Sequence, residues 1–154
     1  LAMAGQTIIG GGTYIGDLIE GTSSYVRRSS RKMREFSGDL SIRKISRYID
    51  DGQPVIWSMS STKAYNNLAN TITNARRGET DPKEWRKSLL EILRETPELE
   101  NISGYGHVCL IIGYNEKTDE IAVSDSWGPK YELRWLSEDA AARVSNGKFY
   151  VVDF

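Results

Sequence analysis

The order of the sequence patterns predicts an α+β fold, in which helices come first and an antiparallel sheet follows. Up to about residue 103, apolar residues recur mainly at helical spacing, with one buried strand predicted at 54–57. Beyond that point, short apolar or alternating segments separated by turn residues predict strands. A length of 154 residues suits one compact domain, and we expect residues 1–154 to form it.

Helix start and stop signals divide the first part of the chain. They predict helices at 2–9, 22–36, 40–49, 63–76 and 81–93. Ser41 and Asp81 can act as N-caps, since a side-chain oxygen there accepts a backbone N–H, and Pro82 suits the first helical position. We interpret residues 61–103 as a helical insertion. Gly10-Gly11-Gly12 is interpreted as a flexible turn, because a phosphate-binding loop requires a strand before it and a helix after it.

The C-terminal part of the chain predicts the sheet. Residues 107–114 are an apolar strand, 115–119 a turn and 120–124 the returning strand. Further strands are predicted at 131–136 and 148–154, with a short helix at 137–144 between them that Ser137 can cap.

Composition excludes several function classes. The formal net charge of −1 at pH 7 provides no overall field that favours nucleic acid or an anionic membrane. No apolar run approaches the roughly 20 residues that a membrane span needs. With one cysteine and one histidine, the chain has no intrachain disulfide and no metal-ligand spacing. We therefore expect no metal, no cofactor, no nucleic-acid partner and no membrane span, while the compartment and the oligomeric state stay open. The basic residues of the predicted helix 22–36 are expected to form a solvated face: Arg27, Arg28, Arg31, Lys32 and Arg34.

One histidine and one aspartate lie where two adjacent strands should bring them together. His107 begins the strand 107–114, and Asp125 follows the returning strand 120–124. An antiparallel pair places the end of its second strand beside the start of its first. We therefore expect the carboxylate to accept an imidazole N–H, which fixes the tautomer and leaves the other ring nitrogen available as a base. This pair is half of a triad of nucleophile, base and orienting group.

The neighbours of the pair support this interpretation. Gly106 leaves space beside the imidazole where a substrate backbone could approach. Trp127 is expected to cover the His–Asp pair, since exclusion of water strengthens a charged hydrogen bond, although the indole would pack in the core under either interpretation. Gly128 permits a sharp exit beneath that ring.

These motifs together resemble a known family. Gly106-His107, an apolar strand, Gly113-Tyr114, a turn, a second strand and then Asp125-Ser126-Trp127-Gly128 resemble the second half of papain-like cysteine peptidases. The family commonly has Asn where this chain has Asp125, but the bacterial bacteriocin-processing branch carries Asp there. Residues 39–60, with a helix and then Gly52-Gln53-Pro54-Val55, resemble the same branch, as does the initial LAMAG.

The resemblance implies a papain-like fold, with N-terminal helices packed on the sheet, that hydrolyses peptide or isopeptide bonds through Cys, His and Asp. His107 and Asp125 would be the base and its orienting group, and a peptide or protein would be the substrate. The nucleophilic cysteine, with a Gln that donates to the oxyanion, is then expected just upstream of Leu1.

Four alternatives concern the nucleophile and the activity. Cys109 follows His107 by two residues on one strand, so their Cβ atoms lie roughly 7 Å apart and parallel, and we expect a buried, inert thiol. Thr13 or Ser23 could replace the nucleophile, although no local pattern marks either. The chain could also be an inactive papain-like binding domain or a transglutaminase-type acyl transferase, which uses the same three residue types.

Overall fold

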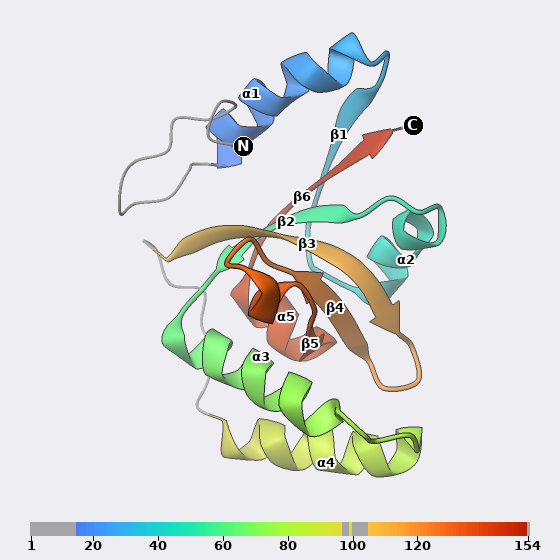
Figure 1. Ribbon diagram of the computed structural model, residues 1–154, viewed down its shortest axis with the longest axis vertical. Helices are drawn as coiled ribbons and strands as arrows, with labels where there is room; N and C mark the ends of the chain where they lie inside the picture. The colour runs from blue at the N-terminus through green and yellow to red at the C-terminus, as the bar shows by residue number, and fades with distance from the viewer. Residues whose placement is uncertain (1–14, 97–98, 100–104, 154) are drawn as a thin grey trace.

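The computed structural model describes residues 15–96, 99 and 105–153. Within these residues, one six-stranded sheet has the strand order β1-β6-β2-β3-β4-β5, and every neighbouring pair is antiparallel. Its strands are β1 (Lys32–Ser37), β2 (Val55–Ser60), β3 (Gly106–Asn115), β4 (Glu120–Ser124), β5 (Arg134–Ser137) and β6 (Ser145–Asp153). The helices are α1 (Ile15–Arg28), α2 (Ile42–Asp50), α3 (Lys63–Arg76), α4 (Pro82–Glu95), the 3₁₀ turn η1 (Pro129–Tyr131) and α5 (Glu138–Val144). The predicted α+β class is confirmed, and Figure 1 shows α3 and α4 stacked at one end of the molecule and α1 beside β1 at the other.

The core lies between one face of the sheet and the helices α2, α3 and α5. Along β2, Val55 and Trp57 point into it, and their cross-strand partners Ile111 and Cys109 on β3 share that face. All four are at most 4% exposed. The helices contribute apolar side chains to the same cluster: Ile45 from α2, Tyr65, Leu68 and Ile72 from α3, and Ala140, Ala141 and Val144 from α5. Burial of this continuous apolar surface is the main stabilising term of the fold.

In the described part of the chain, side chains cap three helices, and two of these caps, Asp81 and Ser137, were predicted from the sequence. Thr62, Asp81 and Ser137 each accept a hydrogen bond from a backbone N–H two or three residues further on. The predicted helices 63–76 and 81–93 are therefore present as α3 and α4. Ser41 precedes α2 as predicted, but its side chain forms no capping bond. Instead, the carboxylate of Glu138 accepts the first backbone N–H of α2 at 2.7 Å, which ties α2 to α5.

The predicted helix at 22–36 is wrong in its second half. The helix α1 ends at Arg28, and residues 32–36 belong to β1, which pairs antiparallel with β6. Phe36 explains the change, because its ring stacks on Phe149 of β6 at 5.1 Å and on Tyr48 of α2 at 4.9 Å. Backbone pairing and aromatic packing from distant parts of the chain have overridden local helix propensity.

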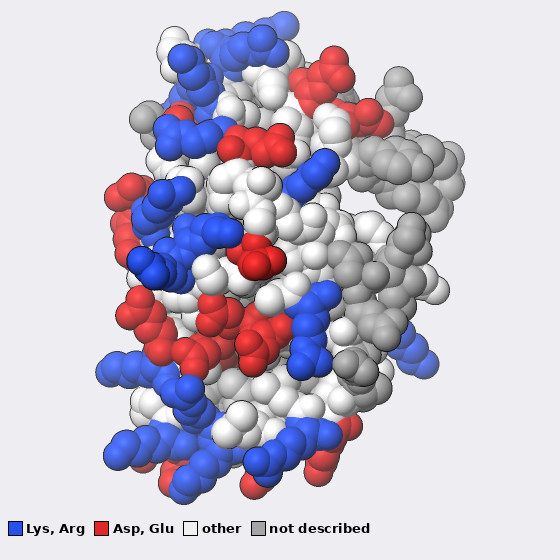
Figure 2. All heavy atoms as spheres, turned by 180° about the vertical axis from the view of Figure 1, so that it is seen from behind, with Lys and Arg blue, Asp and Glu red and all other residues white. Residues whose placement is uncertain are grey.

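The basic residues therefore do not form one helix face. They divide between the end of α1, the following turn and β1, and all of them are exposed: Arg27, Arg28, Arg31, Lys32 and Arg34. Arg34 pairs with Asp153 at 2.6 Å. Figure 2 shows basic and acidic side chains interspersed over the face seen from behind, with the basic side chains most numerous at the upper and lower ends.

One further difference concerns the segment after β4. The strand predicted at 131–136 begins only at Arg134, because Pro129 starts the short turn η1. The helix predicted at 2–9 and the turn at Gly10-Gly11-Gly12 lie outside the described residues. Within residues 15–96, 99 and 105–153, no helix is long and apolar enough to cross a membrane.

A buried carboxylate fixes α3 and α4 against the sheet. Glu120, at the start of β4, has no exposed surface. Its Oε2 accepts hydrogen bonds from Trp85 Nε1 at 2.7 Å, Thr118 Oγ1 at 2.6 Å and Arg76 Nε at 3.2 Å. One carboxylate oxygen thus joins the end of α3, the start of α4 and the β3–β4 turn.

Removal of this carboxylate should destabilise the protein strongly. We expect Glu120→Ala to lower the free energy of unfolding by about 3–5 kcal/mol, because three buried or half-buried donors lose their acceptor. Urea denaturation followed by circular dichroism measures the change. Glu116→Ala, an exposed change in the neighbouring turn, is the matched control and should leave the midpoint unchanged.

Candidate active site

The structure brings the sole imidazole and the predicted aspartate into direct contact. His107 is the second residue of β3, and Asp125 directly follows β4, its antiparallel neighbour. His107 Nε2 lies 2.7 Å from Asp125 Oδ1. The Asp125 side chain is completely buried, whereas 16% of the His107 side chain is exposed. The carboxylate therefore holds the imidazole from the protein interior while part of the ring reaches the surface.

The contact defines which ring nitrogen can act as a base. A carboxylate only accepts hydrogen bonds, so Nε2 carries the proton that it shares with Asp125. In the neutral ring, Nδ1 then has the free lone pair. No described residue forms a hydrogen bond with Nδ1. This nitrogen is available to accept a proton from a nucleophile or to donate one to a leaving group.

A buried arginine that the sequence analysis missed completes the charge arrangement. Arg134 on β5 donates from one terminal nitrogen to Asp125 Oδ2 at 2.7 Å and from the other to Asn66 Oδ1 on α3 at 2.9 Å. Its side chain is 1% exposed, and the rings of Tyr65 and Tyr131 lie 5.3 and 5.2 Å from its guanidinium carbon. The sequence did contain an indication that Arg134 is buried. Side chains alternate along a strand, so Arg134 lies on the same face of β5 as the apolar Leu136 and needs a partner there.

Backbone contacts also orient the carboxylate. The N–H of Ser126 donates to Asp125 Oδ1 at 2.9 Å, so this oxygen accepts from both the imidazole and the backbone. The backbone N–H of Asp125 donates to the carbonyl of Tyr131 at 2.8 Å. Asp125 is thereby fixed at the main chain as well as at both carboxylate oxygens.

Trp127 covers one face of the imidazole. The two ring centroids are 4.4 Å apart with an interplanar angle of 28°, and Tyr131 contacts the indole edge-on at 5.7 Å. The predicted cover is present, but the expectation that Trp127 packs in the core is wrong, because it is 44% exposed. The indole therefore lies at the surface, stacks on the His107 ring and packs against Tyr131.

Gly106 and Gly128, the two glycines predicted at the site, differ in whether the backbone requires glycine. Gly128 has φ of 103°, a left-handed conformation that L side chains rarely adopt, and it leads the chain from Trp127 into η1. A Cβ atom at Gly106 would meet nothing within 4 Å. The position of a Cβ atom at Gly106 is thus open, whereas Gly128 is required by the turn itself.

Comparison with known proteins now places the chain. Residues 5–143 match the Peptidase_C39 like family, and this match covers most of the sequence. The chain belongs to this family. No curated protein matches the chain significantly.

Two solved structures show the same fold. The peptidase domain of Streptococcus mutans ComA has a TM-score of 0.51 and 11% identity, over 93% of this chain and 76% of that one. A putative C39-like peptidase from Bacillus anthracis has a TM-score of 0.51 and 16% identity, over 93% of this chain and 60% of that one. The chain therefore spans less than two thirds of the Bacillus protein. The resemblance to the bacteriocin-processing branch of the papain-like peptidases is confirmed at the level of family and fold.

The thiol of this C39-like chain does not reach the imidazole nitrogen as a nucleophile would. Cys109 points into the core beside Trp57 and is 4% exposed. Burial raises the pKa of the Cys109 thiol far above its usual range, and the nearby Asp125 carboxylate raises it further against the opposing charge of Arg134. The group therefore stays a neutral thiol, as the sequence analysis expected.

The hydroxyl alternatives gain no support. The Ser23 hydroxyl donates to the Ile19 carbonyl inside α1 at 2.6 Å, and α1 packs on β1. Thr13 lies outside the described residues. Among the residues that the structure describes, no group of three His, Cys, Asp or Glu side chains could hold a metal ion.

The ion pair of Asp125 and Arg134 should show strong energetic coupling. We expect Arg134→Met to destabilise the protein by about 3–5 kcal/mol, because it leaves a buried carboxylate with one partner fewer. In an Asp125→Asn background, the same substitution should cost at least about 2 kcal/mol less, since no charge remains to be compensated. Urea denaturation of the four proteins measures this coupling, with the exposed Arg143→Met as control. Additive effects would show that the two charges do not support each other.

Cys109 should be chemically silent in the folded protein. A thiol whose pKa is raised provides almost no thiolate at pH 8, and burial also blocks access of the reagent. We expect no reaction with Ellman's reagent under native conditions and full reaction of one thiol per chain in urea. Rapid native labelling would contradict the buried position.

Proposed function

We propose that this C39-like domain is the His- and Asp-bearing part of a cysteine peptidase that hydrolyses peptide or isopeptide bonds. His107 is the general base and acid, Asp125 its orienting group, and the thiol comes from a cysteine that precedes Leu1, as the family resemblance implies. One observation carries the proposal: the only imidazole is held at Nε2 by a buried carboxylate at 2.7 Å, while Nδ1 is free of described partners. The family membership and the fold support it.

The chemistry follows from this arrangement. Nδ1 takes the thiol proton, which gives a thiolate and an imidazolium that Asp125 stabilises. The thiolate attacks the carbonyl carbon, and the imidazolium then protonates the leaving amine as the carbon–nitrogen bond breaks. In the second half, His107 removes a proton from water, the resulting hydroxide displaces the thiolate from the acyl group, and the carboxylate product leaves. General acid–base steps of this kind contribute about 10²–10⁴ to the rate.

Arg134 and Trp127 serve the pair without touching the substrate carbonyl. Arg134 holds the Asp125 carboxylate in the orientation that faces Nε2, because the guanidinium pairs with its second oxygen inside the protein. Trp127 fixes the ring plane through stacking and excludes water from one side of the hydrogen bond. Gly106 leaves an open approach for a substrate backbone. The peptide substrate is supported by the related structure, which is the peptidase domain of ComA.

The thiol reactivity of the longer reading frame tests the proposal. In a protein extended upstream of Leu1, we expect iodoacetamide to modify one upstream cysteine rapidly near pH 7, as identified by mass spectrometry. His107→Ala should lower both this rate and peptide hydrolysis by about 10³-fold or more, because the thiolate–imidazolium pair cannot form.

Matched variants separate the possible outcomes. Cys109→Ala should leave both rates unchanged, since that thiol is buried. If His107→Ala left alkylation and hydrolysis at the original rates, the base role would be wrong. Absence of any upstream cysteine would indicate an inactive binding domain, and incorporation of amines in place of water would indicate an acyl transferase.

A further inference from the structure

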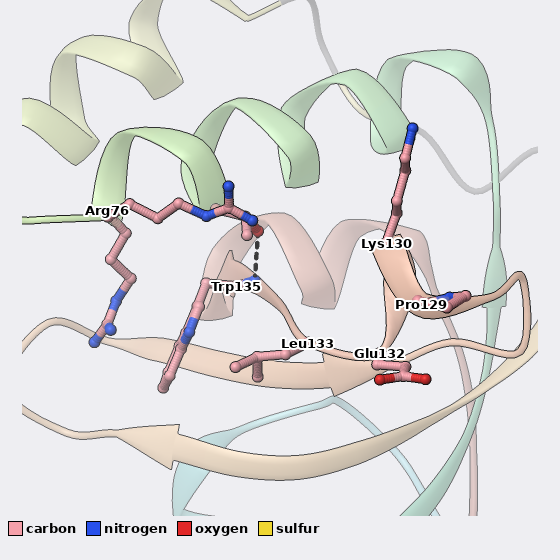
Figure 3. Close-up of a pocket in the computed structure, with 8 residues that line it drawn as sticks. Arg76, Pro129, Lys130, Glu132, Leu133 and Trp135 are labelled. Atoms are coloured by element: carbon pink, nitrogen blue, oxygen red, sulfur yellow. Dashed lines mark hydrogen bonds between the residues drawn. The ribbon is translucent and has the colours of Figure 1, made fainter.

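A charged trough lies next to the candidate active site, between the end of α3 and the segment that leads from η1 into β5. It has a volume of about 400 Å³ and is lined by Thr73, Arg76, Arg77, Pro129, Lys130, Glu132, Leu133 and Trp135. Figure 3 shows Arg76 and Trp135 at one end of this trough, Lys130 and Pro129 at the other, and Leu133 between them. The trough is therefore elongated, with a cation at each end, an apolar side chain in the middle, and the Glu132 carboxylate beside Leu133 toward the end of Lys130.

One of the cations is held in a fixed position. The guanidinium of Arg76 stacks over the Trp135 ring at 3.8 Å, and its Nε donates to the buried Glu120. These contacts leave its two terminal nitrogens without a hydrogen-bond partner among the described residues. A guanidinium that is already ordered loses little entropy when it binds a carboxylate.

The other cations are exposed and have no compensating ion pair among the described residues. Arg77, which follows α3, and Lys130 of η1 both line the trough and are exposed, and Glu132 is the single acidic residue in its lining. Three negative contributions oppose the three cations: Glu132, the Glu120 carboxylate that Arg76 contacts, and about half an elementary charge from the end of the α3 dipole, so the sum of the charges is only slightly positive. The trough therefore attracts anionic groups.

We infer that the trough binds an acidic peptide segment in which acidic residues flank an apolar one. The separation of the cations decides between ligand types. A free phosphate would favour basic groups that converge on one point, whereas here an exposed leucine, 51% accessible, separates Arg76 from Lys130. An extended peptide can place carboxylates at both ends and an apolar side chain on Leu133 and Trp135.

The trough shares a segment with the candidate active site. Residues 125–131 carry Asp125 and Trp127 at the imidazole, and continue through Pro129 and Lys130 into the trough wall. The hydrogen bond from Asp125 N–H to the Tyr131 carbonyl closes this segment at 2.8 Å. The acidic segment is therefore assigned to the polypeptide substrate, an assignment that rests on the proposed peptidase function.

Binding rather than hydrolysis provides the test. Fluorescence anisotropy with the whole chain would compare a labelled Glu-Glu-Leu-Glu-Glu peptide with its Gln-Gln-Leu-Gln-Gln and Glu-Glu-Ser-Glu-Glu counterparts. We expect the first to bind most tightly and to weaken as salt rises. Arg77→Glu and Lys130→Glu should each weaken its binding by about fivefold or more, because an attraction becomes a repulsion. Leu133→Ser should weaken binding of the Leu peptide but not of the Ser peptide.

A control variant and a competitor make the outcome decisive. Lys83→Glu changes the net charge equally at an exposed position on α4 outside the trough, and it should bind as the wild type does. Equal loss in this control, unchanged binding in the trough variants, or competition by inorganic phosphate at the same concentration as the acidic peptide would each overturn the inference. This experiment measures binding and not turnover. If a separate assay found no hydrolysis, that result would count against the peptidase proposal, whereas peptide binding would still support the trough.

Discussion

The buried carboxylate of Asp125 connects two strands of the sheet and orients the histidine. It sits between an imidazole on β3 and a guanidinium on β5, and a third group, the backbone N–H of Ser126, completes its hydrogen bonds. An ionised carboxylate inside a protein is costly unless charges and donors surround it. The positions of β3 and β5 beside β4 bring His107 and Arg134 to this carboxylate. The same contact orients the histidine ring.

Helix α3 is fastened to the sheet at both of its ends. Near its start, Asn66 accepts from Arg134 and so reaches Asp125, which follows β4. At its end, Arg76 donates to Glu120, with which β4 begins. Two buried carboxylates that bracket one strand thus hold one helix, and the apolar face of that helix fills the space between them. Helix α3, which lies in the predicted insertion, is consequently part of the core.

The same connections link chemistry to recognition. The short segment 125–131 carries the carboxylate that contacts His107 and the indole that stacks on it, and its residues Pro129 and Lys130 line the charged trough. Arg76, which Glu120 and Trp135 hold in place, belongs to that trough. A peptide seated in it would contact the elements that fix the imidazole, so substrate position and base orientation would be controlled by one piece of structure.

The sequence by itself determined those features that depend on neighbours along the chain. The helices α3 and α4 follow from caps and apolar spacing within a few residues, and the contact of His107 with Asp125 follows from one strand, a short turn and a returning strand. Tertiary structure decided the features that depend on distant partners. Residues 32–36 have helical propensity, yet pairing with β6 and stacking on Phe149 make them a strand. Arg134 was missed for the same reason, since its partners Asp125 and Asn66 come from other elements and only their approach in space makes a buried guanidinium stable.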